Sequence, residues 1–129
     1  MSGGAPGVGA GASRVPTDIA VSRSDRTLTL SYADGTVHVL PAEYLRVFSP
    51  SAEVQGHAPD QRQVVGGRRY VGIMDLEPIG HYAVRILFDD LHDTGIYSWD
   101  YLWDLAVTRN ARWEGYLADL TKAGKTRDP

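Results

Sequence analysis

Apolar and polar residues alternate between positions 19 and 39, and this two-residue period limits the folds that the chain can adopt. Such alternation is typical of half-buried strands, in which every second side chain faces the core. The apolar positions are Ile19, Val21, Leu28, Leu30, Tyr32, Val37 and Val39. Turn signals at 24–26 and at Asp34-Gly35 separate the runs, and glycine there supplies the positive φ that tight hairpins need. The pattern predicts a three-stranded antiparallel meander.

The middle of the chain contains signals for a short helix and a second pair of strands. Proline is tolerated at the first position of a helix, where its missing amide hydrogen costs least, so Pro41 to Val47 is a predicted helix. Apolar runs at 70–76 and 82–88 predict two strands joined by the turn-rich residues 77–80. Gly66-Gly67 marks the entry to this pair.

Beyond residue 98 the apolar residues recur every three or four positions, which is the period of an amphipathic helix. Ser98 can cap this helix, Asp100 lies near its positive end, and residues 108–110 can break it into two pieces. The apolar positions are Leu102, Leu105, Ala106, Trp113, Leu117 and Leu120. Strands followed by a terminal helix predict an α+β domain, in which a short helix and the C-terminal helix pack on a small antiparallel sheet.

The two ends of the chain differ from its centre in composition. Residues 1–15 form a Gly/Ala-rich segment with too little apolar surface to offset its ordering entropy, so we expect a disordered tail. Residues 122–129 are polar and charged, and we expect them to fray. Residues 16–121 form one predicted domain, which is long enough to bury a core without metal or disulfide staples.

Composition also narrows the function classes. The chain has no cysteine, which excludes disulfides, thiolate metal sites, iron–sulfur ligation and cysteine nucleophiles. A formal charge of −3 gives no general attraction to nucleic acid or to anionic membranes. No apolar run approaches the ~20 residues that cross a bilayer, and the first residues lack the pattern of a signal peptide. We therefore expect a cytoplasmic protein that binds neither nucleic acid nor membrane.

The segment 89–103 is the candidate site, because it places a histidine among acidic and aromatic residues between a predicted strand and a predicted helix. Carboxylate-rich sites tolerate loose geometry, so this histidine and nearby carboxylates could hold zinc or iron weakly. The candidate metal ligands are His92, Asp89, Asp93, His57 and Glu53. The alternative is a structural role, in which the ring of His92 is hydrogen-bonded within the loop and fixes its fold.

Other side chains of this region have structural or binding interpretations. Arg46 and Arg85 are candidate ion-pair partners of the acidic loop, a role that needs no ligand. The aromatic residues either pack in and around the core or form a partner-binding patch, since Trp and Tyr are favoured at interfaces. These aromatic residues are Tyr97, Trp99, Tyr101 and Trp103.

Three blocks of the sequence, residues 40–54, 78–86 and 88–99, resemble the gamma-butyrobetaine hydroxylase-like N-terminal domain family, in the right order. They include Leu45-Arg46, Pro78-Ile79-Gly80-His81 and His92-Asp93-Thr94-Gly95. The resemblance extends over about residues 16 to 121. Similar members occur as small stand-alone bacterial proteins, as the N-terminal domain of carnitine-pathway dioxygenases, and as an appended domain on some P-loop ATPases that carry iron–sulfur clusters.

The resemblance implies a zinc site that this chain does not complete. In the dioxygenases, three cysteines just after a Leu-Arg pair and one histidine hold a structural zinc. The pair and the histidine correspond to Leu45-Arg46 and His92, whereas the cysteines have no counterpart in residues 47–54. Serine hydroxyls stay protonated near neutral pH and are poor zinc ligands. No cofactor is therefore expected, and weak zinc or iron binding is the alternative.

The resemblance also implies a domain that is not an enzyme. The catalytic iron site of the dioxygenases belongs to a separate domain, and no complete catalytic set is visible in this sequence. We expect a non-catalytic binding or adaptor domain whose protein partner is an iron or iron–sulfur protein or a separate dioxygenase. The candidate contact surface comprises residues 49–57 and 89–95. The alternative is a metal-binding protein with a weak site centred on His92 and nearby carboxylates.

Overall fold

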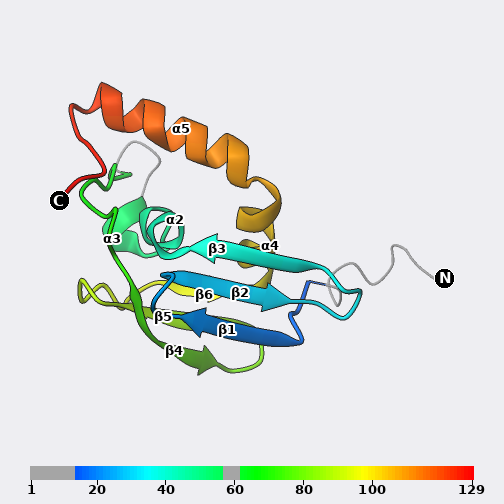
Figure 1. Ribbon diagram of the computed structural model, residues 1–129. Coiled ribbons are helices and arrows are strands. Elements are labelled where there is room, and N and C mark those ends of the chain that lie inside the picture. Colours follow the sequence, from blue (N-terminus) through cyan, green and yellow to red (C-terminus); the bar gives the residue numbers. More distant parts are fainter. Residues whose placement is uncertain (1–13, 57–61) are drawn as a thin grey trace.

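The computed structural model describes residues 14–56 and 62–129, which build two three-stranded antiparallel sheets and four helices (Figure 1). This arrangement is the predicted α+β class. The first sheet contains β1 (Asp18–Ser22), β2 (Thr27–Ser31) and β3 (Val37–Pro41). The second sheet contains β4 (Ile73–Ile79), β5 (Ala83–Phe88) and β6 (Ile96–Ser98). The helices are α2 (Ala42–Val47), α3 (Ala52–Gln55), α4 (Trp99–Val107) and α5 (Arg109–Lys122). In the described part of the chain, no helix is both long and apolar enough to cross a membrane.

The first sheet confirms the predicted meander but corrects the phase of its third strand. Gly35, with a φ of 90°, turns the chain between β2 and β3. Leu28 pairs with Leu40, and both are buried. Successive side chains of a strand point to opposite faces. Val37 and Val39, which were expected to face the core, therefore lie on the outer face and are about half exposed.

The second sheet has one strand more than the predicted pair. β6 lies inside the segment that was expected to be loop, and its three residues are too few for a period to be read from sequence. β4 also extends through Glu77 and Pro78 to Ile79, so the predicted turn at 77–80 is wrong, and the chain turns after Ile79 instead. Proline is tolerated here because β4 is an edge strand.

The helices begin and end close to the predicted signals. The hydroxyl of Ser98 accepts a hydrogen bond from the amide of Tyr101 and caps α4. Ser51 caps α3 in the same way, with the amide of Glu53 as donor. The predicted break between α4 and α5 falls at Thr108, whose hydroxyl donates to the carbonyl of Asp104 over 2.6 Å.

One apolar core joins both sheets to α2, α4 and α5. In Figure 1, α5 lies above α2 and β3, on the side away from β4. Buried tyrosines also tie the elements together: the hydroxyl of Tyr97 donates to the carbonyl of Leu45 over 2.6 Å, and that of Tyr44 to the carbonyl of Leu105 over 2.6 Å. The other three aromatic residues of the 97–103 group are partly buried and pack against this core.

The C-terminal segment is held in place where fraying was expected. Its backbone carbonyls at Thr126 and Arg127 accept hydrogen bonds from the amides of Gly67 and Arg69, over 2.9 and 3.0 Å. These partners lie about 60 positions away in sequence, and a polar composition gives no sign of them.

Candidate functional site

The turn after β5 gives the candidate site its shape. The amide of Phe88 donates to the carbonyl of His92 over 3.0 Å, and the amide of Leu91 donates back to the carbonyl of Phe88 over 3.1 Å. This tight closure requires a φ of 72° at Leu91, in the left-handed region that side chains other than glycine rarely adopt. Residues 89–95, here called the acidic turn, then lead into β6.

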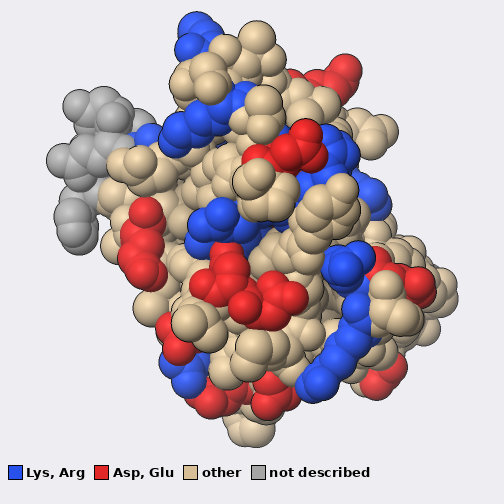
Figure 2. Space-filling view, turned by 60° about the vertical axis from the view of Figure 1, so that its left-hand side comes forward, with Lys and Arg blue, Asp and Glu red and all other residues tan. Residues whose placement is uncertain are grey.

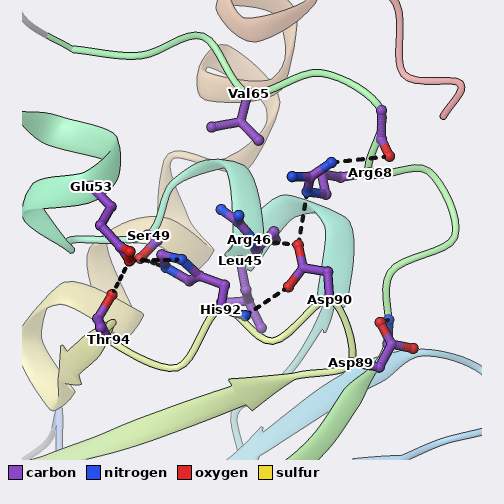
Figure 3. Close-up of polar contacts among 12 residues, drawn as sticks. Leu45, Arg46, Ser49, Glu53, Val65, Arg68, Asp89, Asp90, His92 and Thr94 are labelled. Carbon is purple, nitrogen blue, oxygen red and sulfur yellow. Dashed lines mark hydrogen bonds and ion pairs between the residues drawn. The ribbon is translucent and has the colours of Figure 1, made fainter.

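The ring of His92 is buried and hydrogen-bonded, with 7% of the residue exposed. Its Nε2 lies 2.8 Å from Oγ of Ser49, and its Nδ1 lies 3.7 Å from a carboxylate oxygen of Glu53 (Figure 3). Burial, followed by the nearby positive charge of Arg46, lowers the pKa of His92 below its usual range, and the neighbouring carboxylates oppose this only in part. The imidazole is therefore neutral at neutral pH.

Hydroxyl groups connect the acidic turn to the start of α3. Oγ of Ser51 lies 2.7 Å from Oγ1 of Thr94, which donates to the Glu53 carboxylate over 2.8 Å. The packing is close enough that a side chain at Gly95 would lie 2.6 Å from Oγ of Ser49. The serines that stand where the resemblance implies cysteines are thus part of a hydrogen-bonded network that links α3 to the turn.

A carboxylate between two guanidinium groups anchors the other side of the turn. Oδ2 of Asp90 accepts a hydrogen bond from Nε of Arg46 over 2.8 Å. Nε of Arg68 lies 2.8 Å from the same oxygen, in an ion pair without hydrogen-bond geometry. Burial raises the pKa of Asp90, but the amide of His92 and the two guanidinium groups outweigh it and hold the pKa below its usual range. The predicted ion pairing of Arg46 with the acidic loop is confirmed, whereas Arg85 pairs with Glu77.

The candidate metal ligands are only partly brought together. His92 and Glu53 are neighbours, but the carboxylate of Asp89 points away from them (Figure 3) and accepts a hydrogen bond from the amide of Gly72 over 3.0 Å. Asp93 is exposed, and His57 lies outside the described residues. Within residues 14–56 and 62–129, no group of three or more histidines and carboxylates is arranged to hold a metal ion.

The donor set does not fit the four-ligand zinc site that the family resemblance implies. One imidazole is present, and the nearby serine hydroxyls already have partners: Oγ of Ser49 bonds to that imidazole and accepts from the amide of Ser51, and Oγ of Ser51 bonds to Thr94. Neutral hydroxyls cannot replace thiolates as zinc ligands. What remains is His92 with the Glu53 carboxylate at 3.7 Å, which is a pair of ligands and not a closed site.

Sequence reasoning missed the residue that most distinguishes this surface. Leu91 is 81% exposed, although it lies between Asp90 and His92, which are both fixed by hydrogen bonds. Nothing in an Asp-Asp-Leu-His sequence reveals a positive φ. Figure 2 brings this end of the molecule forward and shows acidic and basic side chains side by side on it, in keeping with the ion pairs of Arg46, Arg68 and Arg69.

Comparisons with known proteins agree with this fold. The family model described as gamma-butyrobetaine hydroxylase-like, N-terminal, matches residues 19–103. Two proteins solved in solution by NMR are 48% and 44% identical, with TM-scores of 0.77 and 0.76. The first alignment covers 90% of this chain and 91% of the other, and the second covers 88% and 85%. A crystal structure of a protein of unknown function from Acidithiobacillus ferrooxidans is 35% identical, with a TM-score of 0.61, over 72% of this chain and 93% of that one. No curated protein matches.

Proposed function

The chain belongs to the gamma-butyrobetaine hydroxylase-like N-terminal family, and from this membership and the geometry of the acidic turn we propose that it is a non-catalytic docking domain. Its proposed partner is another protein, of the class that handles iron or iron–sulfur clusters or a separate dioxygenase. Leu91 is the proposed anchor of the contact. The single observation that carries the proposal is an apolar side chain, 81% exposed, on a backbone conformation that disfavours it.

A leucine at position 91 has an energetic cost that the folded monomer does not recover. A left-handed conformation costs a residue with a side chain about 1 to 2 kcal/mol, and glycine avoids most of this cost. Exposed leucine returns no burial energy to the folded monomer. Strained residues persist where the surroundings over-determine them, and they cluster at functional sites. A partner that covers Leu91 would supply the missing burial energy.

The groups around Leu91 support docking more than catalysis. His92 is engaged with Ser49, and its neutral ring lies below the surface. The Asp90 carboxylate is engaged by Arg46 and Arg68. These contacts make the turn rigid, which lowers the entropy lost when a partner binds.

A second candidate function is weak metal binding at His92. The observation that favours it is the distance of 3.7 Å between Nδ1 of His92 and the Glu53 carboxylate. Under the docking proposal, protein purified without an affinity tag carries substoichiometric zinc, and its fold survives EDTA. One tightly held zinc per chain, with EDTA causing cooperative unfolding, would show a structural zinc site and would contradict the conclusion that the donor set around His92 does not close one.

Affinity capture with immobilised variants tests the docking proposal. Leu91→Gly relieves the backbone, and Leu91→Asp replaces the apolar group with a charge. Both should lose the proteins that the wild type retains from a cell extract, by about tenfold for an anchor worth 1.4 kcal/mol. Val107→Ala is the matched control, because Val107 is an exposed apolar residue on α4, 55% accessible. If both Leu91 variants retain every partner, the contact surface lies elsewhere.

A further inference from the structure

A second feature lies outside the acidic turn: residues 125–128 lie against residues 66–69 and accept hydrogen bonds from their backbone amides. The carbonyls of Thr126 and Arg127 accept from the amides of Gly67 and Arg69 over 2.9 and 3.0 Å. A side chain at Gly66 would lie 2.8 Å from the Thr126 carbonyl, so only glycine allows this close approach. The Gly66-Gly67 pair that stands out in the sequence is thus explained by the segment that passes over it.

The same segment places Arg127 between Glu43 and Trp113, two residues here called the socket. The guanidinium of Arg127 makes two hydrogen bonds, of 2.7 and 2.8 Å, to the carboxylate of Glu43 on α2, whose side chain is 7% exposed. It also lies over the ring of Trp113 on α5, with Cζ 5.2 Å from the ring centroid. A buried carboxylate and an aromatic face are the two groups that best recognise a guanidinium. The next residue, Asp128, pairs with Arg69 over 2.5 Å.

The socket opens into free space. A groove of about 640 Å³ adjoins Arg127 and is lined by Pro41, Tyr44, Arg109 and Glu114 in addition to the socket residues. Arg127 itself is 30% exposed and Asp128 is 65% exposed. Part of the Arg127 guanidinium is therefore reachable from the groove, whereas the Glu43 carboxylate beneath it is buried. A peptide that presents a second guanidinium from the groove would compete with Arg127 for Glu43 and Trp113.

We propose that Glu43, Trp113 and the backbone of residues 66–69 form a binding slot for an extended peptide that carries arginine followed by an acidic residue, presented by a partner protein. Residues 125–128 occupy this slot in cis and define its chemistry. The slot is distinct from the Leu91 contact, and Leu91 variants should leave it unchanged.

The test uses full-length chain and a fluorescent peptide with the sequence of residues 124–129, Gly-Lys-Thr-Arg-Asp-Pro. Arg127→Ala removes the competing guanidinium, so this variant should bind the peptide at least about tenfold more tightly than the wild type does, measured by fluorescence anisotropy. Adding Glu43→Gln should abolish this gain. Adding Glu114→Gln instead is the matched control, because Glu114 lines the same groove without pairing with Arg127, and this change should preserve the gain.

A second peptide, with alanine in place of arginine, allows both peptides to be compared on the same protein variant, so the result does not depend on how different variants fold. It should bind the Arg127→Ala chain at least about tenfold more weakly than the first peptide does. Equal binding of the two peptides, or equal binding of the first peptide to the variant and the wild type, would overturn the proposal. A concentration-dependent wild-type dimer that exchanges its own C-terminal segment would assign the slot to a second copy, and would overturn the partner-peptide proposal as well.

Discussion

The β1–β2–β3 meander and the acidic turn differ in how fully folding explains their residues. In the meander, Leu28, Leu30 and Leu40 face inward and are buried, as the folding of the monomer requires. Arg26 has a positive φ there, of 57°, but its side chain is charged and its carbonyl accepts from the amide of Ala42 over 2.8 Å. Leu91 has the same type of backbone and an apolar side chain in water. Burial accounts for the leucines of the meander, whereas it does not account for a leucine at position 91, which is the residue that the docking proposal explains.

The largest expected effect comes from shortening a buried side chain of the meander. Leu28 is fully buried, so Leu28→Ala should lower the free energy of unfolding by about 3 kcal/mol, through lost burial and the cavity left behind. Val37→Ala, on the exposed face of the same sheet, should cost less than about 1 kcal/mol. Urea titration of both variants measures the two values. Equal losses would mean that the two faces of the sheet do not differ as described.

Removing the carboxylate of the turn should have the next largest effect. Asp90→Ala leaves the buried Arg46 guanidinium without its partner, which destabilises the fold by about 2 to 3 kcal/mol once the partial exposure of Asp90 is allowed for. Asp93→Ala removes an exposed carboxylate three residues further along the same turn and should cost less than about 0.5 kcal/mol. Thermal unfolding of the two variants measures both losses. A neutral Asp90→Ala would show that the ion pairs do not fix the turn.

The third test uses the hydrogen bond of His92 and its pH dependence. His92→Ala should cost about 1 to 2 kcal/mol at pH 7.5, as for a buried hydrogen bond lost. Folding lowers the pKa of His92, so as the pH falls the imidazole takes up a proton in the unfolded chain before it does so in the folded chain. Stability from this residue is therefore fully present above about pH 6.5, the unfolded value, and is lost as pH falls toward the folded pKa. The wild type should show this decline, and His92→Ala should not.

His81→Gln provides the control for that experiment, because His81 is an exposed histidine in the turn between β4 and β5. It should keep the decline in stability below pH 6.5. Unfolding free energies from urea titrations at several pH values give the comparison. A decline that survives in His92→Ala and disappears in His81→Gln would contradict the assignment.

The smallest expected effect has the opposite sign. Leu91→Gly removes the left-handed strain but adds entropy to the unfolded chain, so the net change should be a gain of about 0.5 kcal/mol. Asp93→Gly, in the same turn, has no positive φ to relieve and should lose stability. Differential scanning calorimetry resolves the two signs. A loss of more than 1 kcal/mol in Leu91→Gly would mean that leucine serves the monomer after all.

Local patterns predicted the elements that burial or capping determines. The Asp34-Gly35 turn, the cap at Ser98 and the break at Thr108 were all readable, because each depends on residues close together in sequence. Which residues of β3 face the core was not readable from the sequence, because the register of β3 with β2 decides it. β6 was missed for the same reason, since a three-residue strand depends on its neighbour for definition.

In the candidate site, too, features that depend on nearby residues could be predicted, and features that depend on distant segments could not. A hydrogen-bonded ring at His92 could be predicted, and so could the pairing of Arg46 with the acidic loop, because the charges and their density were visible. The partners Ser49 and Arg68 could not, because Ser49 lies 43 positions from His92 and Arg68 lies 22 positions from Asp90, and only the fold brings them together. The conformation of Leu91 is a property of the closed turn and has no signature in the residue itself.

The short stretch from Arg68 to Gly72 connects the acidic turn to the C-terminal segment. Arg68 pairs with the Asp90 carboxylate, the adjacent Arg69 holds the C-terminal segment through its amide and through Asp128, and the amide of Gly72 binds Asp89. Two proposed binding sites thus share one piece of backbone. Thermodynamic linkage then requires reciprocity: the factor by which a ligand on the turn changes the affinity of the slot equals the factor by which a peptide in the slot changes the affinity of the turn.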